Sequence, residues 1–272
     1  MESQATTRFV NPVSHEAEPE AAKPSTRGRP STLVLRYSLW TAIALALPGC
    51  NVATQRAQYA PAQTAPPTAA SPTPDDSIKR PTSQPYTGDL SIFEDPKRDE
   101  KLQVNRVMDI LGIKEGSGVA DIGAGSGWFT VRAARRVGNG GLVYAVEINP
   151  DYLKHIEGRA EKERLPNVRT ILGKEDDPLL PAQSVDAVLL LKTYHEVAQP
   201  IRLLKHVRQA MRAGARLGII DRNGKGDDHG LDSDVVIREA GRAGFSLDEQ
   251  YDFVKPDGDD YFLVFRVRNS PD

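Results

Sequence analysis

From about residue 95 onward, the chain alternates continuous apolar runs with segments in which apolar residues recur at helical spacing. Short apolar runs bounded by turn residues predict buried strands, and apolar residues three and four positions apart predict amphipathic helices. The expected strands are 118–122, 142–147, 168–172, 185–191 and 215–221. The expected helices before and between them are 97–111, 127–137, 150–165 and 201–213. This alternation is typical of a parallel sheet covered by helices.

The last segment of the chain has a different pattern. A helix is expected at 234–243, and two strands at 246–253 and 261–267 flank the turn residues Pro256-Asp-Gly258. Two strands joined by a short turn form an antiparallel hairpin. The expected fold class is therefore α/β: a doubly wound seven-stranded, mostly parallel sheet with a C-terminal antiparallel hairpin.

The first 87 residues differ from the rest in composition. Residues 51–87 contain seven prolines and no hydrophobic periodicity, which predicts a disordered linker rich in Pro, Ala, Thr and Gln. Residues 1–50 are expected to be an N-terminal extension. Residues 88–272 are expected to be the folded domain, with a length sufficient for one buried core.

The apolar run in this extension ends at Cys50, the only cysteine of the chain. Arg36 precedes the run, which has the length of the apolar part of a secretory signal. The string Leu47-Pro-Gly-Cys50 resembles the bacterial lipoprotein box, with Pro48 in place of the usual small or hydroxyl residue. This resemblance implies a membrane tether through Cys50 and a location in the cell envelope. The alternative is a chance apolar patch in the tail of a cytoplasmic protein.

The motif that carries chemistry is Val119-Ala-Asp-Ile-Gly-Ala-Gly-Ser-Gly127, followed by Glu147 at the end of the next expected strand. Glycines let the backbone turn tightly and approach a ligand with no Cβ in the way. A carboxylate at the end of the second strand can accept both hydroxyls of a ribose. The combination predicts a nucleoside-containing ligand. Trp128 occupies the position of the last glycine of a dinucleotide motif, which disfavours a pyrophosphate.

The string Asp121-Ile-Gly-Ala-Gly-Ser-Gly127 resembles the first motif of the class I S-adenosylmethionine-dependent methyltransferases, and the expected element order resembles their fold over residues 95–268. The resemblance implies S-adenosyl-L-methionine as cofactor and a small-molecule methyl acceptor. The cofactor-binding residues that it implies are Asp121, Gly123, Ala124, Gly125 and Gly127 for the methionine portion, Glu147 for the ribose, Ile148 for the adenine face, Glu175 and Asp176 for the adenine amino group, and Lys192 at the end of the fourth strand. For Glu175 and Asp176 the alternative is a solvated loop.

The candidate catalytic residues are Tyr194, His195 and His229, which follow the fourth and fifth expected strands. Histidine titrates near neutral pH, so either imidazole can take a proton from an acceptor. The alternatives are that His195 packs against the following helix and that His229 is a solvated loop residue. No metal is expected, because catechol-type members of the family place an aspartate where this chain has Lys192.

Charge bears on the partners of the chain. The net charge is −2 and the expected domain contains no dense basic run, so a nucleic-acid substrate is not expected. The oligomeric state is not predicted. Two rival functions are a non-catalytic S-adenosylmethionine-binding module tethered at the envelope and a nicotinamide-dependent oxidoreductase. Trp128 and the terminal hairpin count against the second.

Overall fold

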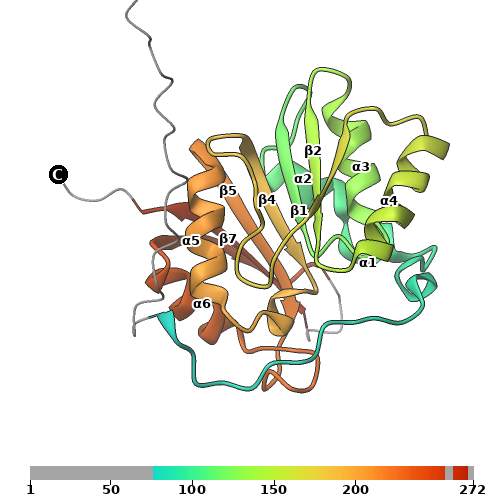
Figure 1. The fold of residues 1–272 in the computed structure, drawn as a ribbon. Coiled ribbons are helices and arrows are strands. Elements are labelled where there is room, and N and C mark those ends of the chain that lie inside the picture. The colour runs from blue at the N-terminus through green and yellow to red at the C-terminus, as the bar shows by residue number, and fades with distance from the viewer. Residues whose placement is uncertain (1–75, 255–259, 269–272) are drawn as a thin grey trace, which may run out of the picture. The chain divides into compact units, whose positions relative to one another are not determined.

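One seven-stranded sheet organises the described part of the chain (Figure 1). The computed structural model describes residues 76–254 and 260–268. The strands are β1 (Gly118–Ile122), β2 (Leu142–Glu147), β3 (Val168–Leu172), β4 (Val185–Leu191), β5 (Met211–Arg222), β6 (Phe245–Tyr251) and β7 (Asp260–Val267). The helices are α1 (Arg98–Leu102), α2 (Val104–Ile110), α3 (Trp128–Val137), α4 (Pro150–Lys162), α5 (Pro200–Ala210) and α6 (Ser233–Arg242), with short 3-10 helices η2 (Leu90–Phe93) and η3 (Tyr194–Glu196).

The strand order is β3-β2-β1-β4-β5-β7-β6. The first five strands are parallel, whereas β7 runs antiparallel to both β5 and β6. This arrangement confirms the expected fold class, including the antiparallel pair at the C-terminal end. The expected turn between the last two strands, Pro256-Asp-Gly258, falls in the segment 255–259 and lies outside the described residues.

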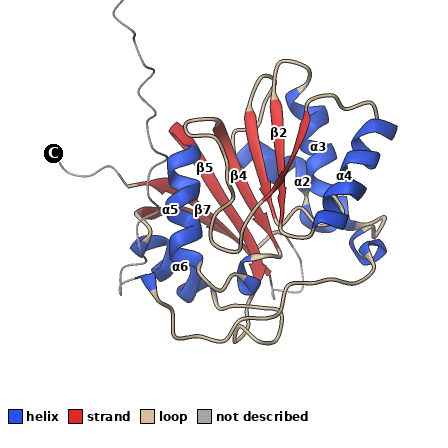
Figure 2. Cartoon of the chain, viewed as in Figure 1, coloured by secondary structure: helices blue, strands red, loops and turns tan. Residues whose placement is uncertain are grey.

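Helices cover both faces of the sheet because successive strand residues point to opposite sides (Figure 2). On β1, Ala120 and Ile122 belong to a core that includes α5 and α6, whereas Val119 belongs to a second core that includes α2 and α3. All but one residue of β4 are buried, as expected for a central strand with a continuous apolar sequence. The parallel arrangement brings the carboxyl ends of β1, β2, β4 and β5 to one edge, where ligands bind in open α/β sheets.

Two expected helices have different boundaries in the structure. The helix expected at 97–111 is divided into α1 and α2, because Gln103 has a left-handed backbone (φ 46°) and its side-chain amide donates to the Phe253 carbonyl at 3.1 Å. The helix expected at 201–213 ends at Ala210, because Met211 already pairs with Val185 of β4. In both cases a contact distant in sequence overrides the local helical pattern.

Residues 76–87, which we call the strap, differ from the flexible linker expected at 51–87. Arg80 forms an ion pair of 2.8 Å with Glu239 of α6, and the two side chains are 10% and 7% exposed. Ser83 is also buried and its hydroxyl donates to the Gly226 carbonyl at 2.9 Å. Figure 1 shows the strap in teal, passing from the side of α6 toward α1. These anchors are polar, so the hydrophobic pattern could not reveal them.

The other expectations for the N-terminal part fall outside the described residues. They concern the extension 1–50, the lipoprotein-like segment ending at Cys50 and the linker residues 51–75. Within the described residues, no helix combines the length and the apolar composition needed to cross a membrane.

Candidate functional site

The loop after β1 requires glycine at its first position. Gly123 has a φ of 71°, and a Cβ built on it would lie 2.3 Å from Cγ2 of Thr193. Its N–H donates to the Val146 carbonyl at 2.9 Å, and the N–H of Ala124 donates to the same oxygen at 3.1 Å. The loop is therefore folded tightly against the end of β2. Gly125 and Gly127 also have left-handed backbones, with φ values of 54° and 74°.

Glu147 is held at the end of β2 by backbone amides. Its carboxylate accepts hydrogen bonds from the N–H groups of Gly125 (3.0 Å), Ile148 (2.8 Å) and Asn149 (3.3 Å). The residue is only 8% exposed, yet it lines the cavity described below. The amides fix the carboxylate in one orientation at the place where the sequence predicts ribose recognition.

Asp121 is a buried carboxylate directly before the glycine loop. It is 2% exposed and accepts a hydrogen bond of 2.6 Å from the hydroxyl of Thr130 on α3. Burial raises the pKa of Asp121 to about 6, while the hydrogen bond from Thr130 and the charge of Arg98 oppose the shift. A cationic ligand group beside Asp121 would favour its ionised form.

Trp128 separates two arginines at the start of α3. The guanidinium carbon of Arg98 lies 4.4 Å from the centre of the Trp128 ring, and that of Arg132 lies 4.0 Å from it. Arg98 also donates to the Phe93 carbonyl at 2.8 Å and borders the cavity. Arg98 therefore places a positive charge near Asp121 at the border of the cavity.

A cavity of about 290 Å³ joins these groups to the strap. Its wall includes residues 82–86 of the strap and the side of η3 that carries Glu196. Eight of the residues expected to bind cofactor line it: Asp121, Gly123, Ala124, Gly125, Glu147, Ile148, Glu175 and Lys192. The remaining two lie elsewhere. Gly127 faces Ile156 of α4, and Asp176 forms an ion pair of 3.1 Å with Arg202.

Lys192 has an unusual position at the end of β4. Its backbone is left-handed (φ 58°), and its N–H donates to the Ile220 carbonyl at 2.7 Å. Its ammonium group forms an ion pair with the buried carboxylate of Asp260. Lys192 thus lines the cavity, and the carboxylate of Asp260 on β7 neutralises its charge.

None of the three candidate catalytic residues lines the cavity: Tyr194 and His195 are buried, and His229 is exposed. The Tyr194 hydroxyl donates to Glu239 at 3.0 Å, and burial raises its pKa well above the ordinary value. His195 is 4% exposed, and its Nδ1 lies 2.9 and 3.0 Å from the two carboxylate oxygens of Asp221. Tyr194 therefore belongs to the ion pair that anchors the strap, whereas His195 is oriented by β5.

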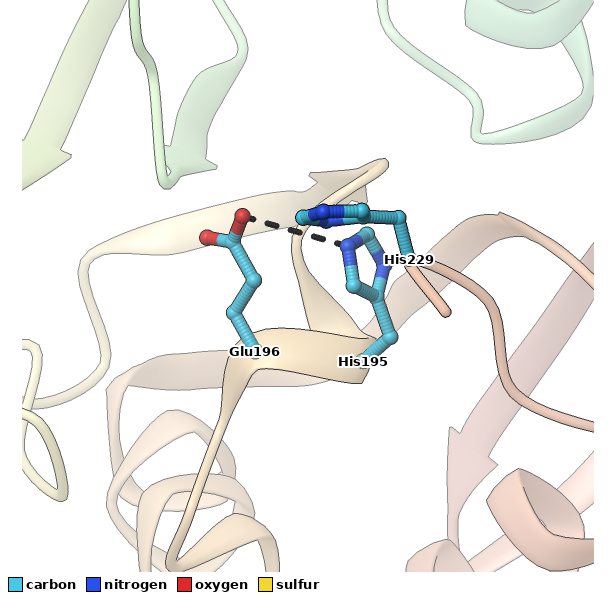
Figure 3. Close-up of side chains that lie close together, drawn as sticks. All are labelled: His195, Glu196 and His229. Atoms are coloured by element: carbon cyan, nitrogen blue, oxygen red, sulfur yellow. Dashed lines mark ion pairs between the residues drawn. The ribbon is translucent and has the colours of Figure 1, made fainter. Parts of the chain in front are cut away.

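Glu196 is a cavity residue that the sequence did not single out. It follows His195 on η3, and its Oε1 lies 3.8 Å from Nε2 of His195. Burial raises the pKa of Glu196 to about 7, and His195 opposes the shift. Figure 3 shows His195, Glu196 and His229 with their polar ends directed toward one another. The sequence offered one signal for Glu196, namely its position next to His195 in the string 192–196. Its proximity to His229 has no such local signal, because His229 lies on a loop 34 positions beyond His195.

Comparison with known proteins agrees with this geometry. Residues 119–214 match the family described as a methyltransferase domain. The chain is 36% identical over 103 residues to an uncharacterized methyltransferase of Mycobacterium tuberculosis, covering 38% of each chain. It is 34% identical over 83 residues to nocamycin O-methyltransferase of Saccharothrix syringae, covering 30% of each chain. The structure of a SAM-dependent methyltransferase from Aquifex aeolicus superposes with a TM-score of 0.59, 24% identity and coverage of 66% of this chain and 98% of that chain.

The fold is that of the class I methyltransferases. The matched sequence runs from β1 to the start of β5. It includes the glycine loop, Glu147 and the residues of η3 that follow β4. The chain spans 38% and 30% of the length of the two curated relatives named above.

The matched domain and the class I methyltransferase fold imply S-adenosylmethionine as the cofactor. The residues present fit this molecule. Gly123 and Gly125 line the cavity with no Cβ of their own, and the Glu147 carboxylate is presented to the cavity by three amides. Asp121 and Arg98 supply one negative and one positive group for an amino-acid moiety.

Proposed function

We propose that this domain is an S-adenosylmethionine-dependent methyltransferase that acts on a small-molecule acceptor. The observation that carries the proposal is one continuous cavity. It joins the glycine loop and Glu147 to Glu196 and the strap, so that a cofactor half and an acceptor half share one space. Such a concave site with a few fixed polar groups is the usual form of a small-molecule site.

The residues of this chain would hold the cofactor by complementary groups. Glu147 would accept the ribose hydroxyls and Ile148, which is 38% exposed, would cover a face of the adenine. Asp121 would face the amino group and Arg98 the carboxylate of the methionine moiety. When bound, S-adenosylmethionine supplies a methyl group already activated by its sulfonium, so positioning provides much of the catalysis.

The size and the walls of the cavity favour a small acceptor. Strap residues 82–86 cover the side next to η3, which leaves room for a compact molecule and not for a folded macromolecule. The similarity to nocamycin O-methyltransferase supports the same class of acceptor.

The first experiment is calorimetric titration of the full-length chain with S-adenosylmethionine and, separately, with NADH. We expect micromolar binding of S-adenosylmethionine alone and at least tenfold weaker binding by Glu147→Ala, a loss of about 1.4 kcal/mol or more. Glu161→Ala, which removes an exposed carboxylate from α4, is the matched control and should bind like the wild type. Absence of S-adenosylmethionine binding would refute the proposal, and binding of NADH would favour the oxidoreductase.

A second experiment separates an enzyme from a non-catalytic binding module. The chain is incubated with methyl-labelled S-adenosylmethionine and with the low-molecular-weight, protein and RNA fractions of a bacterial extract. Label is expected in the low-molecular-weight fraction and should be absent with Glu147→Ala. Label in protein or RNA would overturn the small-molecule acceptor, and no transfer to any fraction would favour the binding module.

We also propose that the chain is a lipoprotein of the cell envelope, tethered through Cys50. The support is the string Leu47-Pro-Gly-Cys50 after an apolar run. Expression with a labelled fatty acid should label the wild type and leave Cys50→Ala unlabelled. Equal absence of label from both proteins would favour the cytoplasmic alternative.

A further inference from the structure

His195, Glu196 and His229 form a cluster of metal-ligating side chains. One ligand atom from each residue lies within 4.8 Å of the others, and Nε2 of His195 is 3.8 Å from Oε1 of Glu196. The two imidazole rings are perpendicular, with centres 5.8 Å apart. Figure 3 shows that two of the side chains come from η3 and that His229 approaches from a separate loop.

Asp221 orients the buried histidine of this cluster. Both of its carboxylate oxygens lie within hydrogen-bond distance of Nδ1 of His195, so Nδ1 carries the proton and donates. In the neutral ring, Nε2 then has a free lone pair. The distance of 3.8 Å from Nε2 to Glu196 is too long for a hydrogen bond. A carboxylate that holds a histidine in this manner is a regular feature of metal sites, where it fixes the ring and raises its basicity.

The charges around the cluster favour a cation. Asp221 is fully buried and Glu196 is largely buried, and His195 is the one basic side chain with which either forms an ion pair among the described residues. Two carboxylates thus face imidazole nitrogens without a lysine or arginine partner. A divalent cation between Glu196 and the histidines would compensate this charge.

His229 is held near the other two ligands by the strap. Its N–H donates to the hydroxyl of Ser83 at 3.0 Å, and the same hydroxyl donates to the Gly226 carbonyl. Its left-handed backbone (φ 58°) turns the side chain toward η3, as Figure 3 shows. The cluster is consequently completed by a loop whose position depends on Ser83.

We propose that His195, Glu196 and His229 bind a divalent transition-metal ion of the zinc class, with Asp221 supporting His195. Two histidines and one carboxylate are a known zinc ligand set that leaves a fourth position open. Zinc bonds of about 2.0–2.1 Å place tetrahedral ligand atoms roughly 3.3–3.4 Å apart, so the three side chains need only a small inward movement. This site is distinct from the position at Lys192 on which the expectation of no metal rested.

Glu196 also lines the cavity, so the fourth position would lie beside the space assigned to the acceptor. An acceptor hydroxyl or thiol that occupied it would become more acidic. This consequence rests on the proposed function, whereas the metal site itself does not.

The test is titration of the full-length, chelator-treated chain with Zn²⁺ by calorimetry and with Co²⁺ by visible absorption. We expect one equivalent to bind, with the intense visible bands of four-coordinate Co²⁺. His229→Ala and Glu196→Gln should weaken Zn²⁺ binding at least tenfold. His155→Ala, which removes an exposed histidine from α4, is the matched control and should bind like the wild type. His229 is exposed, so its replacement is expected to leave the fold intact.

Zn²⁺ binding that is absent, or that is unchanged in both His229→Ala and Glu196→Gln, would overturn the proposed metal site. S-adenosylmethionine titrated into the same metal-free protein distinguishes the two proposals. If the protein binds S-adenosylmethionine but not Zn²⁺, the proposed metal site alone is refuted. If it binds Zn²⁺ but not S-adenosylmethionine, the proposed function alone is refuted.

Discussion

The two halves of the cavity are built in different ways. The cofactor half is made largely of backbone groups, and its side-chain bonds join residues close in sequence: Gly125 to Glu147 across 22 positions and Thr130 to Asp121 across nine. The strap that covers the other half is held, outside the cavity lining, by side chains from distant segments. Arg80 reaches Glu239 across 159 positions.

The difference has an energetic consequence. A backbone cradle keeps its donors when a side chain is replaced, whereas a buried network of charges leaves an unpaired group behind. We therefore expect the polar anchors of the strap to be more sensitive to single substitutions than the cofactor half. The following variants test this contrast, from the largest expected effect to the smallest.

Arg80→Met should have the largest effect on stability. It takes the Arg80 guanidinium from the buried Glu239 carboxylate, which keeps the hydrogen bond from the Tyr194 hydroxyl, so we expect a loss of about 3–5 kcal/mol in the free energy of unfolding by urea. Lys101→Met removes one partner of the exposed ion pair with Asp95 and should leave the stability almost unchanged. Equal losses in the two variants would show that the strap is not an integral part of the fold.

Gly123→Ala tests the backbone cradle itself. The left-handed backbone and the contact with Thr193 together should cost about 2–4 kcal/mol and abolish S-adenosylmethionine binding. Gly112→Ala is a matched control, since Gly112 has a similar φ of 72° but open space around the added methyl. The control should lose only about 1–2 kcal/mol. Similar losses in urea unfolding would mean that the close contact with Thr193 is unimportant.

Asp121→Asn should separate stability from binding. Burial raises the pKa of Asp121 from 3.8 to about 6, so the folded wild type loses stability as the pH rises from about 4 to about 6, where the unfolded chain has already released the proton that the folded chain still holds. The variant should therefore gain stability relative to the wild type as the pH rises from about 4 to above 6, by up to about 2–3 kcal/mol.

The same variant should lose affinity for S-adenosylmethionine at pH 7.5. In the wild type, this affinity should fall as the pH drops through about 6, and Asp121→Asn should lack that dependence. Calorimetry and thermal unfolding at several pH values measure both effects. A variant that loses stability at pH 7.5 would contradict the assignment of Asp121 as a strained buried carboxylate.

Ser83→Ala should have the smallest effect. It removes the hydroxyl that bridges His229 and Gly226, at a cost of about 1–2 kcal/mol. Thermal unfolding measures the loss. Ser91→Ala removes an exposed hydroxyl whose partner is Asp89 and should change stability by less than about 0.5 kcal/mol. If the two serine variants behave alike, Ser83 does not anchor the loop that carries His229.

The sequence predicted the sheet and the cofactor half because both depend on local patterns. The first four expected strands have the same boundaries in the structure, and the glycine loop with Glu147 lies where the motif placed it. The sequence did not predict the strap or the role of Glu196. Arg80, Ser83 and Asp221 are single polar residues whose partners are remote, and nothing in their neighbourhoods distinguishes them from surface residues.

Trp128 gives the cavity an optical reporter of its own. The indole ring is 2% exposed, borders the cavity and lies between the guanidinium groups of Arg98 and Arg132. A ligand that moves Arg98 alters the electric field across this ring, and indole emission responds to such a field. Occupancy of the cavity should thus be readable from intrinsic fluorescence, with no dye attached to the protein.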